Sequence, residues 1–258
     1  MVKNSTSARS PLSPTLWPED AFRWWASLGL GAAVAMLLVV PAVFVLALLI
    51  GFKLIPAQHL NAANPTLTWP LLVAQLASYL PAIALLVVVL PRIARRPLAA
   101  LGFRAPRPSD LVWGLCGALV MIAVASGAGI MQDVVFHLKT DEVQVHLLSN
   151  ARGSVIAGFA FLACIAAPFA EEFVFRGFLF NAILRYVPVA GAIVLSAIVF
   201  GFAHLQPGNA GAIAPLAAAG LVLAAVYYYS GSLVASMLAH GLFNLVTVVA
   251  VVAFHSKG

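Results

Sequence analysis

The chain has 258 residues, of which 63% are hydrophobic and 9% are charged, and its formal net charge is +6. Soluble domains carry about 25% charged residues, so this composition excludes an ordinary soluble protein. The basic residues lie mostly in connections between apolar runs, which is the distribution of a membrane protein and not of a nucleic-acid-binding one. Cys116 and Cys164 both fall within apolar runs, where we expect them to pack as small side chains without a disulfide.

Apolar runs long enough to cross a bilayer recur along the whole chain. The sequence therefore predicts an all-α, polytopic membrane bundle with about seven transmembrane helices. Residues 1–22, rich in Ser and Pro, are predicted to be a disordered tail, and residues 23–258 to form one integral membrane domain. The expected spans are, in chain order, residues 24–52, 70–91, 111–131, 154–185, 189–205, 211–229 and 233–254.

The connection after the second span is the most basic part of the chain, and the positive-inside rule predicts that it lies in the cytoplasm. The N-terminus then lies in the cytoplasm as well, and the C-terminus lies outside. This connection carries Arg92, Arg95, Arg96, Arg104 and Arg107.

The fourth span is too long for one straight crossing at about 1.5 Å per residue. We expect Pro168 to break it, because a proline inside a helix removes one hydrogen bond and clashes with the preceding turn. The segment that holds Glu171 would then be a helical piece of its own.

Glu171 and Glu172 are the acidic residues of the chain that lie within an apolar span. A carboxylate near the bilayer centre costs about 2.5–3.5 kcal/mol on insertion scales, so it is usually paired, functional or both. Arg176 follows Glu172 by four residues, the favourable order for a helical ion pair, whereas Glu171 points about 140° away from Arg176. The pattern predicts a Glu172–Arg176 pair that supports Glu171 as a general base. The structural alternative is an ion pair beside an acid that reaches toward the membrane surface.

His204 and His240 are the histidines that lie in spans, and Asn244 shares a helix face with His240. An antiparallel hairpin about Pro188 would bring Glu171 and His204 to a similar depth, about 25 Å from the turn at 1.5 Å per residue. His240 lies only about 10 Å from the expected start of its span, so that start must lie deeper or the helix must tilt. As a structural alternative, the polar pair on the last span could be an interhelical contact.

This polar set suits hydrolysis. A desolvated glutamate can take a proton from water, and histidine and asparagine can stabilise the oxyanion. Alternatively, Glu171, His204 and His240 could hold one divalent metal ion, with zinc as the first candidate, because two His and one Glu form a known catalytic set. The sequence leaves the metal-free and the metal-dependent mechanism open. A proton-coupled transporter would also need membrane Glu and His, but no inverted repeat is visible.

Three motifs in this order, Glu171-Glu172-x-x-x-Arg176, Phe200-x-x-x-His204 and His240-x-x-x-Asn244, resemble the CPBP (CAAX protease and bacteriocin-processing) family of intramembrane proteases. Its best-known members are the type II CAAX prenyl endopeptidases. The runs Gly231-Ser232-Leu233 and Leu101-Gly102-Phe103-Arg104 are also typical of the family. The resemblance covers about residues 98–250, the expected catalytic core.

The resemblance implies a helical bundle around an embedded catalytic cavity, in a bacterial cytoplasmic membrane. The enzyme would hydrolyse peptide bonds of membrane-associated peptides or proteins, including lipid-modified ones. Carried over by motif, Glu171 would activate water, His204 would assist it or bind metal, and His240 with Asn244 would stabilise the oxyanion or complete a metal site. Glu172, Arg176 and Phe200 would support the site or contact substrate. The alternative is a non-proteolytic membrane factor of the same fold, acting in self-immunity or secretion.

Overall fold

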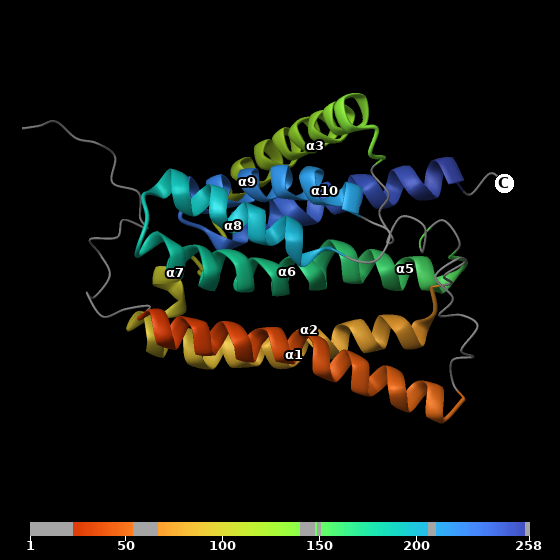
Figure 1. The fold of residues 1–258 in the computed structure, drawn as a ribbon, viewed down its shortest axis with the longest axis horizontal. Coiled ribbons are helices and arrows are strands. Elements are labelled where there is room, and N and C mark those ends of the chain that lie inside the picture. The colour runs from red at the N-terminus through yellow and green to blue at the C-terminus, as the bar shows by residue number, and fades with distance from the viewer. Residues whose placement is uncertain (1–22, 54–66, 140–147, 149–150, 206–209, 256–258) are drawn as a thin grey trace, which may run out of the picture.

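The computed structural model describes residues 23–53, 67–139, 148, 151–205 and 210–255, and all regular structure in these residues is helical (Figure 1). The predicted tail, residues 1–22, lies outside the described residues. The helices are α1 (Trp24–Gly51), α2 (Trp69–Ala94), η3 (Leu98–Leu101), α3 (Pro108–Phe136), α5 (Ser154–Phe161), η4 (Leu162–Ala166), α6 (Ala167–Glu172), η5 (Phe173–Phe180), α7 (Asn181–Leu184), α8 (Val189–Ala203), η6 (Ala210–Ala212), α9 (Ile213–Ser230) and α10 (Leu233–His255).

Five helical segments in the described part of the chain are long and apolar enough to cross a membrane. They are Trp69–Ala94, Pro108–Phe136, Ser154–Leu184, Ala210–Ser230 and Leu233–Phe254. Two further apolar helices, Trp25–Leu37 and Val189–Ala203, are shorter than a full crossing. The helices thus lie where the sequence predicts them, in an integral membrane protein, but a count of seven crossings is not confirmed.

The long helices run roughly along one direction and form successive layers (Figure 1). α1 and α2 lie side by side, and the rod formed by α5, α6 and α7 follows them. α8, α9 and α10 pack on the other side of this rod, and α3 covers α9 and α10 from outside. The rod that carries both glutamates is therefore enclosed on two sides, which removes its polar side chains from lipid.

The fourth span is one continuous helix from Ser154 to Leu184, so the predicted break at Pro168 is wrong. Two π-helical stretches, η4 and η5, replace α-helical hydrogen bonding on either side of α6. At the first of them the amide of Ala167 donates to the carbonyl of Leu162, five residues earlier. Because Pro168 has no amide hydrogen, the widened turn accommodates it without a break and leaves the Ala163 carbonyl for a partner on another helix.

The last helix begins at Leu233, as predicted, but this start lies inside the protein. Ser232 and Leu233 are both fully buried, and the amide of Leu233 donates to the carbonyl of Gly102 at 2.9 Å. Gly102 has a φ of +88°, and a Cβ there would lie 3.0 Å from neighbouring backbone, so the contact requires glycine. The buried start explains how His240, only seven residues further along, reaches the depth of Glu171.

Candidate functional site

Glu172 is the centre of a buried polar network. Its side chain is fully buried and pairs with Arg176, whose Nη1 lies 3.1 Å from Oε1. The ion pair predicted from the i, i+4 spacing is therefore present. Ser236 of α10 donates to the other carboxylate oxygen, Oε2, at 2.5 Å. Since a buried charge is tolerated only when it is paired and hydrogen-bonded, these contacts explain how Glu172 is accommodated in the bundle.

Arg176 connects this network to α8 and α9. Its Nη2 donates to the carbonyl of Gly220 at 3.0 Å, and its guanidinium carbon lies 4.6 Å from the centroid of the Phe200 ring. Gly220 lets α9 approach α8, because a Cβ there would lie 3.1 Å from the backbone of Ala197. Phe200 therefore packs against the Arg176 guanidinium and supports the buried network through this cation–π contact.

Glu171 occupies the opposite face of α6 and reaches a different set of groups. Its Oε2 lies 3.6 Å from Nε2 of His204 and 3.9 Å from Nε2 of His240. This oxygen is buried and accepts no hydrogen bond from the described residues. The other oxygen, Oε1, is 3.5 Å from the hydroxyl of Tyr79 on α2. The two adjacent carboxylates thus have separate partners, as the helical geometry predicts.

His204 follows the last residue of α8, beyond the hairpin about Pro188 that the sequence predicts. Its Nδ1 lies 2.8 Å from the carbonyl of Phe200. A carbonyl can only accept a hydrogen bond, so Nδ1 carries the hydrogen. In the neutral ring Nε2 is then an acceptor, and it faces the Glu171 carboxylate. Two acceptors cannot hydrogen-bond to each other, so a group with two donor hydrogens, such as water, could contact both.

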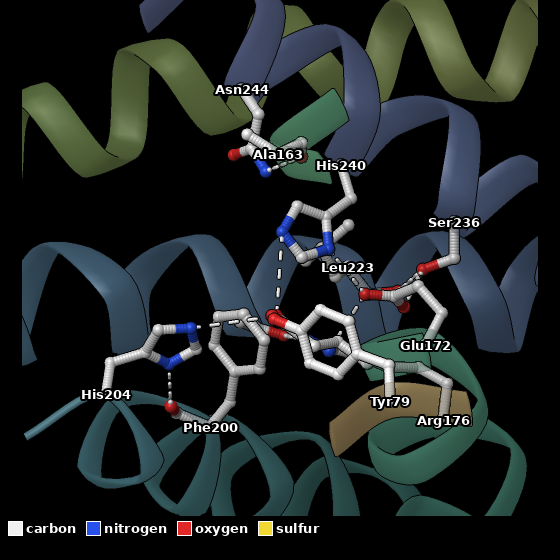
Figure 2. Close-up of polar contacts among 12 residues, drawn as sticks. Tyr79, Ala163, Glu172, Arg176, Phe200, His204, Leu223, Ser236, His240 and Asn244 are labelled. Carbon is white, nitrogen blue, oxygen red and sulfur yellow. Dashed lines mark hydrogen bonds and ion pairs between the residues drawn. The ribbon is translucent and has the colours of Figure 1, made fainter. Parts of the chain in front are cut away.

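His240 bridges the two glutamates. Its Nδ1 lies 2.9 Å from Glu172 Oε1, so the carboxylate accepts from Nδ1 and fixes the ring plane. Figure 2 shows the contact of His240 with Glu172. Nε2 is thereby turned toward Glu171. The Phe200 ring lies edge to face against this imidazole, at a centroid distance of 5.8 Å. The Phe200 carbonyl thus orients His204, and the Glu172 carboxylate orients His240.

Asn244 lies one turn beyond His240 and joins α10 to the π-helical stretch. Its Nδ2 donates to the Ala163 carbonyl at 2.7 Å, the same carbonyl that the widened turn at Pro168 leaves without a partner in its own helix. Gly241 permits this approach, because a Cβ there would lie 2.4 Å from the carbonyl oxygen of Cys164. The irregular helix and the glycine together bring Asn244 to the site.

The polar groups line a cavity of about 610 Å³. The rest of its lining is largely apolar and includes residues of α1, α2, α3, α5, α8, α9 and α10. Val43 of α1 also lines the cavity and is 59% exposed. The cavity therefore opens to the surface of the bundle beside α1. The polar residues that line it are Gln75, Ser78, Tyr79, Glu171, His204, His240, Asn244 and Thr247.

The predicted metal ligands Glu171, His204 and His240 do converge. However, no group of three or more His, Cys, Asp or Glu among the described residues is arranged so that it could hold a metal ion. Glu171 Oε2 lies 3.6 and 3.9 Å from the two Nε2 atoms, and we route no chemical step through a metal. Metal dependence stays a prediction from sequence, to be tested by chelation.

Sequence reasoning missed two residues of this network. The sequence analysis assigns no role to Ser236, yet its hydroxyl contacts Glu172 directly. A signal was available, because Ser236, His240 and Asn244 are spaced by four residues and share one helix face. Tyr79 lies outside the motif region, and an aromatic residue in an apolar span gives no comparable signal.

Comparison with known families agrees with this geometry. Residues 153–246 match the family described as Type II CAAX prenyl endopeptidase Rce1-like. No curated protein and no solved structure matches the chain. The matched segment runs from the start of the rod into α10, and it contains the three motifs from Glu171 to Asn244. Residues 153–246 are therefore similar to the type II CAAX prenyl endopeptidases, in agreement with the resemblance of the three motifs to the CPBP family of intramembrane proteases.

Proposed function

We propose that this protein is an intramembrane endopeptidase in which Glu171 activates the attacking water. The family match supports CAAX-type peptide-bond hydrolysis. The observation that carries the mechanism is the position of Glu171 Oε2, which faces Nε2 of both His204 and His240 at the wall of the cavity. A general base must lie within reach of the proton that it removes, directly or through one water.

The first step is attack of water on the scissile carbonyl carbon. Water donates one hydrogen to Glu171 Oε2 and the other to Nε2 of His204, the two acceptors that lie 3.6 Å apart. Glu171 takes the proton as the oxygen–carbon bond forms, and the carbonyl electrons move to the oxygen. His204 aligns the water, and its ring is held by the Phe200 carbonyl.

The oxyanion that forms needs hydrogen-bond donors on the other side of the cavity. His240 supplies one from Nε2 when this nitrogen carries a hydrogen, while Nδ1 stays hydrogen-bonded to Glu172. The amide of Asn244 carries two hydrogens, of which one donates to Ala163 and the other serves the oxyanion. Both residues come from one face of α10, so a single helix fixes this pair.

In the second step the intermediate collapses. The carbonyl reforms, the carbon–nitrogen bond breaks, and Glu171 returns its proton to the leaving nitrogen. The products are a new carboxyl group and a free amine, and Glu171 is again a carboxylate. Glu172 and Arg176 take no part in these transfers. They hold His240 in orientation and keep the second carboxylate paired.

The cavity supports a membrane-associated substrate. Its apolar walls suit a lipid-modified or otherwise apolar peptide, and its reach to exposed Val43 supports access from the lipid side. The predicted cytoplasmic side is the end at which α2 finishes. To test this orientation, single cysteines are placed beside the arginines at this end, and their labelling by a reagent that does not cross the membrane is measured in sealed vesicles of known orientation.

Cleavage by the pure protein tests the proposal. Wild type in detergent micelles is incubated with a peptide library that includes prenylated and unprenylated CAAX-type sequences, and the products are read by mass spectrometry. We expect one new amino terminus from wild type and at least about a 100-fold slower reaction from Glu171→Gln. Cleavage at the wild-type rate by Glu171→Gln would exclude this mechanism. No cleavage by either protein would favour the non-proteolytic alternative.

A further inference from the structure

The helix α2 contributes to the cavity although it lies outside the matched residues 153–246. Gln75, Ser78 and Tyr79 all line the cavity. The Ser78 hydroxyl donates within its own turn, to the Gln75 carbonyl at 2.6 Å. Among these three residues, Tyr79 makes a hydrogen bond that crosses to another helix, and the acceptor is Glu171. This contact connects α2 directly to the proposed general base.

Tyr79 and the histidines contact different oxygens of the same carboxylate. The Tyr79 hydroxyl lies 3.5 Å from Oε1, whereas both imidazoles face Oε2. Rotation about the last torsion of a glutamate is nearly free and has a roughly two-fold profile. A donor on one oxygen therefore fixes the plane of the carboxylate and determines which oxygen faces the cavity.

Tyr79 is the described side chain whose donor lies within 3.5 Å of the Glu171 carboxylate, whereas Nε2 of His204 and of His240 lie 3.6 and 3.9 Å from it. The acceptor Oε2 receives none within the described residues, and the partners of the adjacent Glu172 are separate groups: Arg176, Ser236 and His240. Glu172 is thus held by three donors, whereas Glu171 is held by one. Tyr79 is the contact that can restrict Glu171 while leaving Oε2 available for water.

We propose that Tyr79 is a positioning residue, which holds Glu171 through Oε1 so that Oε2 presents its lone pairs to water beside His204 and His240. The inference rests on the proposed function of Glu171 as the general base. It extends the active site to a helix outside the family motifs. Apo hydrogen bonds of catalytic groups are often long and shorten when the reaction complex forms, so a distance of 3.5 Å is consistent with this role.

The test compares two tyrosine-to-phenylalanine variants. Tyr79→Phe removes only the hydroxyl that contacts Glu171. Tyr227→Phe is the control, because its hydroxyl is also held by hydrogen bonds inside the bundle but donates to the Leu101 carbonyl and accepts from Asn181, away from the cavity. Both variants are purified in the same detergent and tested with a fluorogenic prenylated CAAX peptide.

For Tyr79→Phe we expect kcat to fall roughly tenfold, as the loss of one charge-assisted hydrogen bond implies. Its KM should stay within about twofold and its melting temperature should be unchanged, because substrate binding and the buried packing are retained. Tyr227→Phe should have a lower melting temperature and a kcat per folded molecule equal to wild type. An unchanged kcat in Tyr79→Phe, or a fall in melting temperature equal to that of Tyr227→Phe, would overturn the positioning role.

Infrared spectroscopy gives a readout that does not need turnover. The difference spectrum between wild type and Glu171→Gln isolates the carboxylate bands of Glu171. We expect Tyr79→Phe to shift these bands and Tyr227→Phe to leave them in place. If wild type cleaves no peptide, the proposed function fails while the band shift still decides whether Tyr79 holds Glu171. If wild type cleaves and the bands do not move, only the inference about Tyr79 fails.

Discussion

Nδ1 of His240 lies 2.9 Å from Oε1 of Glu172, and this contact fixes the direction of the opposite ring nitrogen toward Glu171. Two adjacent residues of one helix thus have different partners. Glu172 points into the bundle and holds an imidazole, whereas Glu171 points into the cavity beside that same imidazole. A single ring connects the paired carboxylate with the one proposed to react.

Because the two glutamates have different partners, removing the charge of Glu172 should destabilise the folded protein more than removing the charge of Glu171. Glu172→Gln leaves the buried guanidinium of Arg176 without its carboxylate, and breaking a buried pair costs about 3–5 kcal/mol. Glu171→Gln removes a carboxylate whose described hydrogen bond is a single long one, so the folded protein should change little. Thermal unfolding of both variants in detergent measures the difference. Equal losses of stability would show that the two glutamates do not have separate functions.

Ser236→Ala tests the second donor to Glu172. The variant removes the hydroxyl 2.5 Å from Oε2, so we expect a loss of about 1.5–3 kcal/mol, as for a hydrogen bond to a charged group. Because Glu172 also orients His240, kcat should fall several-fold while KM stays close to wild type. Ser126→Ala, at an exposed position of α3, is the control and should match wild type in both measurements. A Ser236→Ala variant with wild-type unfolding and kcat would contradict the network.

Gly241→Ala tests the close approach of α10 to the π-helical stretch. The added Cβ would lie 2.4 Å from the Cys164 carbonyl oxygen, so the helices must separate, at a cost of about 1–3 kcal/mol. His240 and Asn244 flank this position, so cleavage should fall as well. Gly127→Ala is the matched control, because a Cβ there meets nothing within 4 Å. It should be neutral or stabilise α3 by up to about 1 kcal/mol. Similar melting temperatures for the two variants would exclude the close contact.

The positions of the helices could be predicted because each depends on an apolar run that is visible in the sequence. The local irregularity at Pro168 could not. A proline rule considers one α-helix alone, whereas here a π-helical turn accommodates the proline, and Asn244 from another helix satisfies the Ala163 carbonyl that becomes available. Tertiary contacts thus decide whether the proline breaks the helix.

In the candidate site, too, contacts set by helix spacing could be predicted, whereas contacts set by tertiary packing could not. The i, i+4 spacing predicts the pair of Glu172 with Arg176, and the hairpin about Pro188 predicts that His204 meets Glu171. The depth of His240 was not predictable from span lengths, because α10 begins at a buried residue, Leu233. A partner on a distant helix leaves no periodic signal, which is why Tyr79 could be found only in the structure.

The central claim is that Glu171 and not a metal ion activates the water. The most direct measurement is the cleavage rate of a prenylated CAAX peptide by pure wild type before and after dialysis against a strong chelator, with Glu171→Gln measured in parallel. The account predicts the same rate with and without chelator, and a rate at least about 100-fold lower for Glu171→Gln. Loss of wild-type cleavage on chelation, restored by zinc, would contradict it.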